Sequence, residues 1–149
     1  MAEERESFFW DVVAGKAPLP PASIMLGWRV LSAEPGHVRV ELTAREEFYN
    51  PAGSVQGGIL AAMLDEAMGP AAVTLMGPDE MTATLEMKVS YIRPATAGRL
   101  IAEGRVVHKG RSVVFMEGSL TTDDGSLIAT ATATARIVPF SGGASGRQA

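Results

Sequence analysis

The stretch GGILAAMLDEAMGPAAVTL, residues 57–75, decides the fold because it predicts one long buried helix. Its larger apolar side chains recur at helical spacing: Ile59, Leu60, Met63, Leu64, Ala67 and Met68. Alanines occupy most of the other positions, and a helix that is apolar or small nearly all round is a buried helix. Pro70 lies inside the stretch, so we expect a kink or an early end there.

Extended segments lie on both sides of this helix in the sequence. Residues 24–33 and 37–43 precede it, with Gly36 in the turn between them. Four more segments follow, at 82–91, 99–109, 111–122 and 127–137, and the run DDG at 123–125 is typical of a hairpin turn. This order predicts an α+β domain in which an antiparallel sheet wraps around one long central helix.

Alternating side chains assign faces to these strands. Val38, Val40 and Leu42 share one face of the second strand. In the segment 82–91, apolar residues at odd positions alternate with polar residues at even positions. Thr84 is therefore expected on the opposite face of the strand from Met87. The run ATATATA near the end of the chain places alanines 129, 131, 133 and 135 on one face, which leaves room for the helix to approach.

The two ends of the chain are expected to lie outside this domain. Residues 3–14 predict a short helix with acidic residues in its first turn, and the prolines at 18, 20 and 21 then start an extended piece. The tail from Ser141 is rich in glycine and serine and is expected to be mobile. The predicted division is an N-terminal helix and linker at 1–23, the domain at 24–138, and a flexible tail at 139–149.

Composition excludes several classes of function. The 149 residues are 46% hydrophobic and include no cysteine, which excludes disulfide frameworks, zinc–cysteine clusters and thiol nucleophiles. We expect no metal. The net charge of −4 disfavours a nucleic-acid partner. The acidic N-terminus lacks the layout of a signal peptide, and no apolar run is long enough to span a bilayer, so we expect a cytoplasmic protein with no membrane partner.

Several short motifs in order resemble one known family. They are NPAGSVQGG at 50–58, LDEA at 64–67, YIRP at 91–94, KGRS at 109–112 and the later DG at 124–125. Together they are similar to the hotdog-fold acyl-CoA thioesterases of the phenylacetate-degradation type, over about residues 24–138. The resemblance implies a hotdog fold, no cofactor, and dimers that pair their sheets edge to edge.

The residues that start the helix suit a carbonyl group. Gly57 and Gly58 present free backbone N–H groups at the positive end of the helix dipole, where they can polarise a thioester carbonyl and hold the oxyanion that forms. The alternative is that the two glycines only make a tight turn from strand to helix.

Asp65 is a carboxylate on an otherwise apolar helix, which is costly unless it has a partner or a task. The alternative is that this face of the helix touches solvent. Eight residues at ~1.5 Å rise separate it from Gly57 by about 12 Å, so the two cannot serve one carbonyl within one chain. A two-fold dimer with antiparallel helices would bring Asp65 of one chain to Gly57 of the other.

The resemblance assigns roles to these residues. Asp65 would be the nucleophile or the base that activates water, and Gly57 the oxyanion donor. Asn50 would orient the thioester or the water, and Thr84 would position water near the carboxylate. Gln56 departs from the pattern, because many relatives carry histidine there; its amide can donate a hydrogen bond but cannot shuttle protons near neutral pH.

Coenzyme A carries phosphates, and arginine suits phosphate recognition. By resemblance, the residues expected to bind the substrate are Gly58, Tyr91, Arg93, Lys109, Gly110, Arg111 and Ser112. Each of the cations taken alone is equally consistent with an ordinary surface residue.

The sequence therefore predicts an acyl-CoA thioesterase that releases a free acid and coenzyme A and that forms a dimer at least, and a tetramer from two dimers. One alternative is an acyl-thioester dehydratase or hydratase, which Gln56 argues against. Others are a non-catalytic acyl-CoA-binding protein and a purely structural dimer module; the latter leaves Asp65 unexplained.

Overall fold

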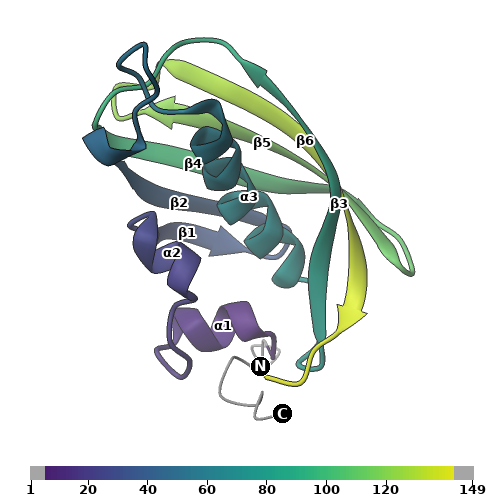
Figure 1. Cartoon of the computed structure of the whole chain (residues 1–149). Coiled ribbons are helices and arrows are strands. Elements are labelled where there is room, and N and C mark those ends of the chain that lie inside the picture. Colours follow the sequence, from purple (N-terminus) through teal and green to yellow (C-terminus); the bar gives the residue numbers. More distant parts are fainter. Residues whose placement is uncertain (1–5, 143–149) are drawn as a thin grey trace.

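A curved antiparallel sheet wraps around the helix α3, Gly57–Val73, in the computed structural model, which describes residues 6–142 (Figure 1). Within those residues the sheet has six strands, in the order β1-β2-β4-β5-β6-β3. Their bounds are β1 Arg29–Glu34, β2 His37–Ala44, β3 Glu80–Tyr91, β4 Gly98–Lys109, β5 Val113–Thr122 and β6 Leu127–Pro139. The predicted α+β arrangement is confirmed, and β1 and β3 form the two edges of the sheet.

The helix lies closest to the sheet at two glycines of the central strands. A Cβ atom on Gly104 would overlap the Ala67 carbonyl group and lie 2.6 Å from the Met68 nitrogen. A Cβ on Gly118 would lie 2.9 Å from the Met68 side chain. The alanines of β6 are buried on the inner face as predicted, but the closest approach to α3 is made by β4 and β5.

Pro70 does not end the helix, so the expected early end is wrong. α3 continues to Val73. Proline has no N–H to donate to the carbonyl four residues earlier, which belongs to Glu66. The Trp28 indole N–H donates to that carbonyl oxygen at 3.0 Å, so the missing bond is replaced from outside the helix.

The predicted faces of β3 are wrong on one side of a bulge. The pairing of β3 with β6 shifts between Thr84 and Glu86, which leaves Leu85 unpaired. Thr84 therefore pairs with Ala135, and Met87 pairs with Ala133, both on the inner face. An extra residue in one strand reverses the alternation beyond it, and here it turns Thr84 toward α3.

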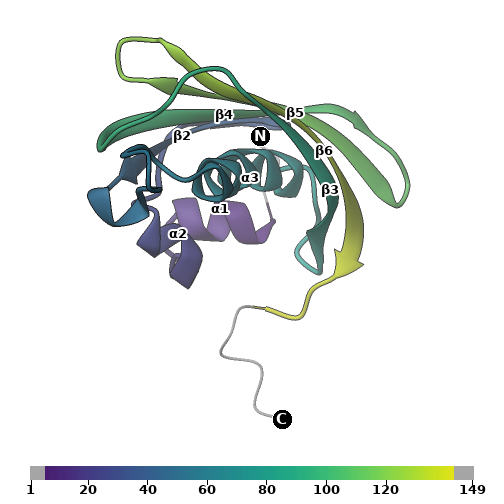
Figure 2. The ribbon, with the colours of Figure 1, turned by 45° about the horizontal axis from the view of Figure 1, so that its top comes forward.

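Two short helices cover the side of α3 that faces away from the sheet (Figure 2). α1, Phe8–Val13, lies within the predicted helix at 3–14, of which residues 3–5 lie outside the described part. α2, Pro21–Met25, replaces the start of the strand expected at 24–33. Its cause is Pro21, whose fixed φ and missing N–H suit the first turn of a helix.

In the described range, none of the helices is long and apolar enough to cross a membrane. Of the tail predicted from Ser141 onward, residues 143–149 lie outside the described part. A short 3₁₀ helix, Glu46–Phe48, precedes the loop that leads into α3.

Candidate active site

Two groups of predicted site residues lie along α3, one at its start and one halfway along it. Asp65 lies in the middle of the helix, and Gly57 is its first residue. β3 contacts both groups, because Thr84 near its start bonds to Asp65 and Tyr91 at its end bonds to Gly57. The structure thus supplies two half-sites along one helix and one strand.

Asp65 is half-buried and has a defined partner. The Thr84 hydroxyl donates a hydrogen bond to Asp65 Oδ1 at 3.0 Å. This contact depends on the bulge at Leu85, which turns Thr84 to the inner face. The bond leaves the other carboxylate oxygen available to a substrate or a water molecule.

Glu66, to which the sequence assigns no role, lies next to Asp65 and is also half-buried. The Ser23 hydroxyl of α2 donates to Glu66 Oε2 at 2.7 Å. Burial raises the pKa of Glu66, the Ser23 bond opposes this, and the charge of Asp65 raises it further. The only sequence signal for Glu66 was its position in the same apolar helix.

A cavity of about 260 Å³ opens beside these two carboxyl groups. Its walls come from α1, the segment around α2, the second half of α3 and the start of β3. Most of its lining is apolar or aromatic, with Ser23, Asp65, Glu66, Thr82 and Thr84 as the polar contributions. The sequence analysis missed the part of this wall that comes from residues 8–28.

Glu66 gives a testable pH dependence of stability. Its folded-state pKa is raised above the ordinary value of 4.5, so the stability it contributes is fully present below about pH 4.5 and is lost as the pH rises through the raised pKa. We expect the free energy of unfolding of wild type to fall relative to that of Glu66→Gln as the pH rises. Urea unfolding at several pH values between about 4 and 8 checks this, and parallel curves would contradict it.

The start of α3 forms the second half-site. Within residues 6–142 the structure gives neither the Gly57 nor the Gly58 N–H group an acceptor, and both lie at the positive end of the helix dipole. The Tyr91 hydroxyl donates to the Gly57 carbonyl oxygen at 2.8 Å. A Cβ on Gly57 would lie 3.2 Å from the Tyr91 ring, so glycine permits this close packing.

Asn50 and Gln56 lie at the same end with different constraints. Asn50 Oδ1 accepts hydrogen bonds from the backbone N–H groups of Ala52 and Ser54, at 2.9 and 3.3 Å. This holds the loop before α3 and leaves the Asn50 NH₂ group free to donate. Gln56 precedes the helix with an exposed side chain that makes no capping bond. A hollow of about 310 Å³ is lined by Asn50, Gly57, Tyr91 and Arg93, among others.

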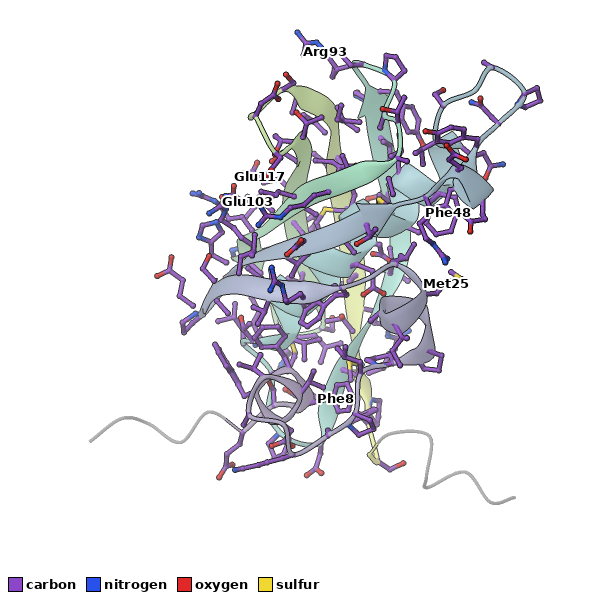
Figure 3. The ribbon with its side chains drawn as sticks, turned by 90° about the vertical axis from the view of Figure 1, so that its left-hand side faces the viewer. Phe8, Met25, Phe48, Arg93, Glu103 and Glu117 are labelled. Carbon is purple, nitrogen blue, oxygen red and sulfur yellow. The ribbon has the colours of Figure 1, made fainter. Side chains whose placement is uncertain are left out.

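The predicted cations are not brought together within one chain. Arg93 lies at the far end of the molecule from Phe8 (Figure 3) and donates to the Leu127 carbonyl oxygen at 3.0 Å. The hairpin with Lys109, Gly110, Arg111 and Ser112 lies at the other end of β3, because the adjacent Val113 pairs with Arg136, which pairs with Ala83. The hairpin extends past the edge of the sheet body (Figure 1).

A larger open hollow, about 430 Å³, lies on the outer face of the sheet. Its lining includes two basic and two acidic side chains: Lys88, Arg105, Glu103 and Glu117. None of the predicted site residues lines it. In the described residues, no group of three or more histidine, aspartate or glutamate side chains is arranged to hold a metal ion.

Comparison with known proteins gives consistent matches. A family model of the thioesterase superfamily matches residues 52–129. The crystal structure of a phenylacetic acid degradation-related protein from Ralstonia eutropha has a TM-score of 0.84 and 35% identity, covering 87% of this chain and 99% of that chain.

Two curated relatives match at lower identity. The 1,4-dihydroxy-2-naphthoyl-CoA hydrolase of Listeria monocytogenes is 26% identical over 103 residues, which cover 69% of this chain and 84% of the relative. Human acyl-coenzyme A thioesterase 13 is 28% identical over 102 residues, which cover 67% of this chain and 72% of the human protein. The matched residues 52–129 of the family model contain Gly57, Asp65 and Thr84.

Proposed function

The chain belongs to the thioesterase superfamily and has its hotdog fold, and on this basis we propose that it hydrolyses acyl-coenzyme A thioesters to a free acid and coenzyme A. One observation carries the proposal: a half-buried carboxylate, held by the Thr84 hydroxyl, lies at an apolar cavity on a helix that starts with two free N–H groups. A carboxylate and an oxyanion donor are the two groups that thioester hydrolysis needs.

The chemistry uses these groups in one of two ways. The Gly57 N–H and the helix dipole polarise the thioester carbonyl and stabilise the oxyanion. Asp65 then either removes a proton from water as the water attacks the carbonyl carbon, or attacks that carbon itself to form an anhydride that water cleaves. In both routes the carbon–sulfur bond breaks, the thiolate leaves with a proton, and one water is consumed.

Gln56 assists by orientation. Its NH₂ group is a hydrogen-bond donor that can reach a carbonyl oxygen at the start of α3, but it has no titration near neutral pH. The two histidines line neither half-site: His37 bonds to Glu103, and His108 packs against Phe115. This arrangement supports hydrolysis over a dehydratase, which pairs an acid with a histidine.

The two half-sites lie too far apart for one chain, since eight helical residues span about 12 Å. We therefore propose that two copies pair along their β3 strands, which are long sheet edges with unpaired backbone groups. An antiparallel pairing centred on Lys88, with Leu85 left unpaired by the bulge in each copy, would set Thr84 opposite Tyr91 of the second copy, with inner-face residues opposite inner-face residues. Because Thr84 bonds to Asp65 and Tyr91 to Gly57, that register brings Asp65 to Gly57 of the second copy.

The same pairing supports the predicted coenzyme A contacts. The hairpin at 109–112 lies at the Thr84 end of β3, and Arg93 lies at the Tyr91 end. In the paired arrangement the hairpin of one copy and Arg93 of the other face one site. Their cations are then placed to bind the phosphates of a single coenzyme A.

A thiol-release assay with a panel of short, medium, long and aryl acyl-CoA thioesters tests the proposal. We expect hydrolysis of at least one panel member, with kcat/KM of about 10⁴ M⁻¹s⁻¹ or more for a preferred substrate. Heat-unfolded protein is the control for background hydrolysis. Absence of release across the panel, with coenzyme A still bound in calorimetry, would support the non-catalytic alternative instead.

A further inference from the structure

The cavity beside Asp65 has the position and size of a binding site for the acyl group. Phe9, Trp28 and Met81 line it from three separate segments of the chain, and Asp65 is also one of its lining residues. A cavity of about 150 Å³ can hold benzene, so 260 Å³ accommodates a ring with a short linker or a chain of medium length. In the paired arrangement proposed above, the carbonyl carbon lies at Asp65 and the acyl group extends into this space.

Glu66 is the feature of the cavity that an unsubstituted hydrocarbon would not need. Enclosing a carboxyl group among apolar side chains is unfavourable unless its oxygens are bonded. In the described part of the chain only Ser23 bonds to this carboxyl group, through Oε2. The other oxygen, Oε1, is therefore available in a cavity that Glu66 lines.

We propose that this cavity binds the acyl part of the thioester and that Glu66 is a specificity-determining residue for acyl groups that carry a hydroxyl group. The substrate hydroxyl donates a hydrogen bond to the unpaired Glu66 oxygen, and Ser23 holds the carboxyl group in place from α2. This works whether or not Glu66 is ionised, because an oxygen accepts in both forms. The inference rests on the proposed function, since it takes Asp65 as the reacting end of the cavity.

A purely structural role for Glu66 makes a different prediction. If the Ser23–Glu66 bond served only to attach α2 to α3, the residue would affect stability and overall rate without distinguishing one acyl group from another. A hydroxyl-binding role instead changes the ratio of two substrates that differ only in a hydroxyl group. A substrate without the hydroxyl group would leave the second Glu66 oxygen unpaired, and this lowers kcat/KM for the unsubstituted substrate.

The experiment compares kcat/KM for benzoyl-CoA with each ring-hydroxylated isomer, and for hexanoyl-CoA with its terminally hydroxylated form. We expect wild type to prefer at least one hydroxylated substrate about tenfold or more, as one additional hydrogen bond allows. Glu66→Leu is expected to abolish that preference, and Glu66→Gln to keep most of it, because the amide oxygen accepts from Ser23 while the NH₂ group replaces the second oxygen and donates to the oxygen of the substrate hydroxyl group. Leu19→Ala, which enlarges the same cavity, is the matched control that changes size preference and retains the hydroxyl preference.

Equal kcat/KM for all pairs in wild type, or an unchanged preference in folded Glu66→Leu, would overturn the inference. Failure of the proposed function is distinguished by calorimetry with non-hydrolysable ketone analogues of the same thioesters. If no thioester is hydrolysed, a tenfold difference in Kd between hydroxylated and plain analogues that Glu66→Leu removes still supports the cavity assignment. No difference in Kd overturns it.

Discussion

Asp65→Asn is expected to lower kcat for acyl-CoA hydrolysis by about a thousandfold while leaving the fold intact. The amide has no negative charge, so it neither attacks the carbonyl carbon nor accepts a proton from water. Its oxygen still accepts the hydrogen bond from Thr84, and the substitution removes a charge beside Glu66. Single-turnover and steady-state thiol release measure the loss, and thermal unfolding checks the fold.

Asp79→Asn is the matched control for this variant. Asp79 is exposed in the loop before β3, and its only hydrogen bond in the described residues is made through its backbone carbonyl oxygen, to Phe140. The same chemical change at this position is expected to leave kcat within about twofold of the wild-type value. If Asp65→Asn turned over substrate at nearly the wild-type rate, Asp65 would not be the reacting carboxylate.

Gly104→Ala is expected to lower the free energy of unfolding by about 3 kcal/mol, the upper part of the usual range for overpacking. The added Cβ would overlap the Ala67 carbonyl group and lie 2.6 Å from the Met68 nitrogen. These are backbone atoms of α3, so no side-chain rotation relieves the clash and the helix must move away from β4. Urea unfolding measures the shift in midpoint.

Gly69→Ala provides the comparison on the same helix. Apart from the adjacent residues, a Cβ there would meet no atom within 4 Å, and the gain of about 0.5–1 kcal/mol usual for replacing a helical glycine with alanine is opposed by the steric restriction on a residue that precedes proline, here Pro70. We therefore expect Gly69→Ala to change the free energy of unfolding by less than about 1 kcal/mol, well below the loss expected for Gly104→Ala. A Gly104→Ala variant that unfolded at the wild-type urea concentration would show that the helix does not lie so close to β4.

The sequence predicts the large elements of this fold because their patterns are strong and local. The helix is predicted by apolar spacing in 57–75, and β2 by the alternation of Val38, Val40 and Leu42, all of which are fully buried. The helix α2 is missed because the three nearby prolines indicate extended chain. They do not show that the last of them starts a helix.

The site was predictable only in part. Gly57, Asp65 and Thr84 have sequence signals, but the contact between Thr84 and Asp65 requires the bulge at Leu85, which no local pattern indicates. The partner of Glu66 is 43 residues away in sequence, so its environment emerges only when α2 packs on α3. Such long-range contacts depend on tertiary packing, and alternation along one strand does not report them.

Complementation between two inactive variants tests the central claim, which is that a thioester is hydrolysed at a site shared by two chains. The first variant is Asp65→Asn. The second is Gly57→Pro, which removes the N–H at the first position of α3, where the fixed φ of proline suits a helix. Gln56 already has the extended conformation that precedes proline, with ψ 138°, and the exposed Tyr91 ring must move by a few tenths of an ångström to accept the added Cβ.

The two variants are unfolded in urea, mixed in equal amounts and refolded together, and thiol release is measured before and after mixing. Each alone is expected to be almost inactive. In the mixture about a quarter of all sites combine an intact Asp65 with an intact Gly57 from the other chain, so about a quarter of wild-type activity should return. A mixture of folded, associated chains no more active than its components would contradict the shared site.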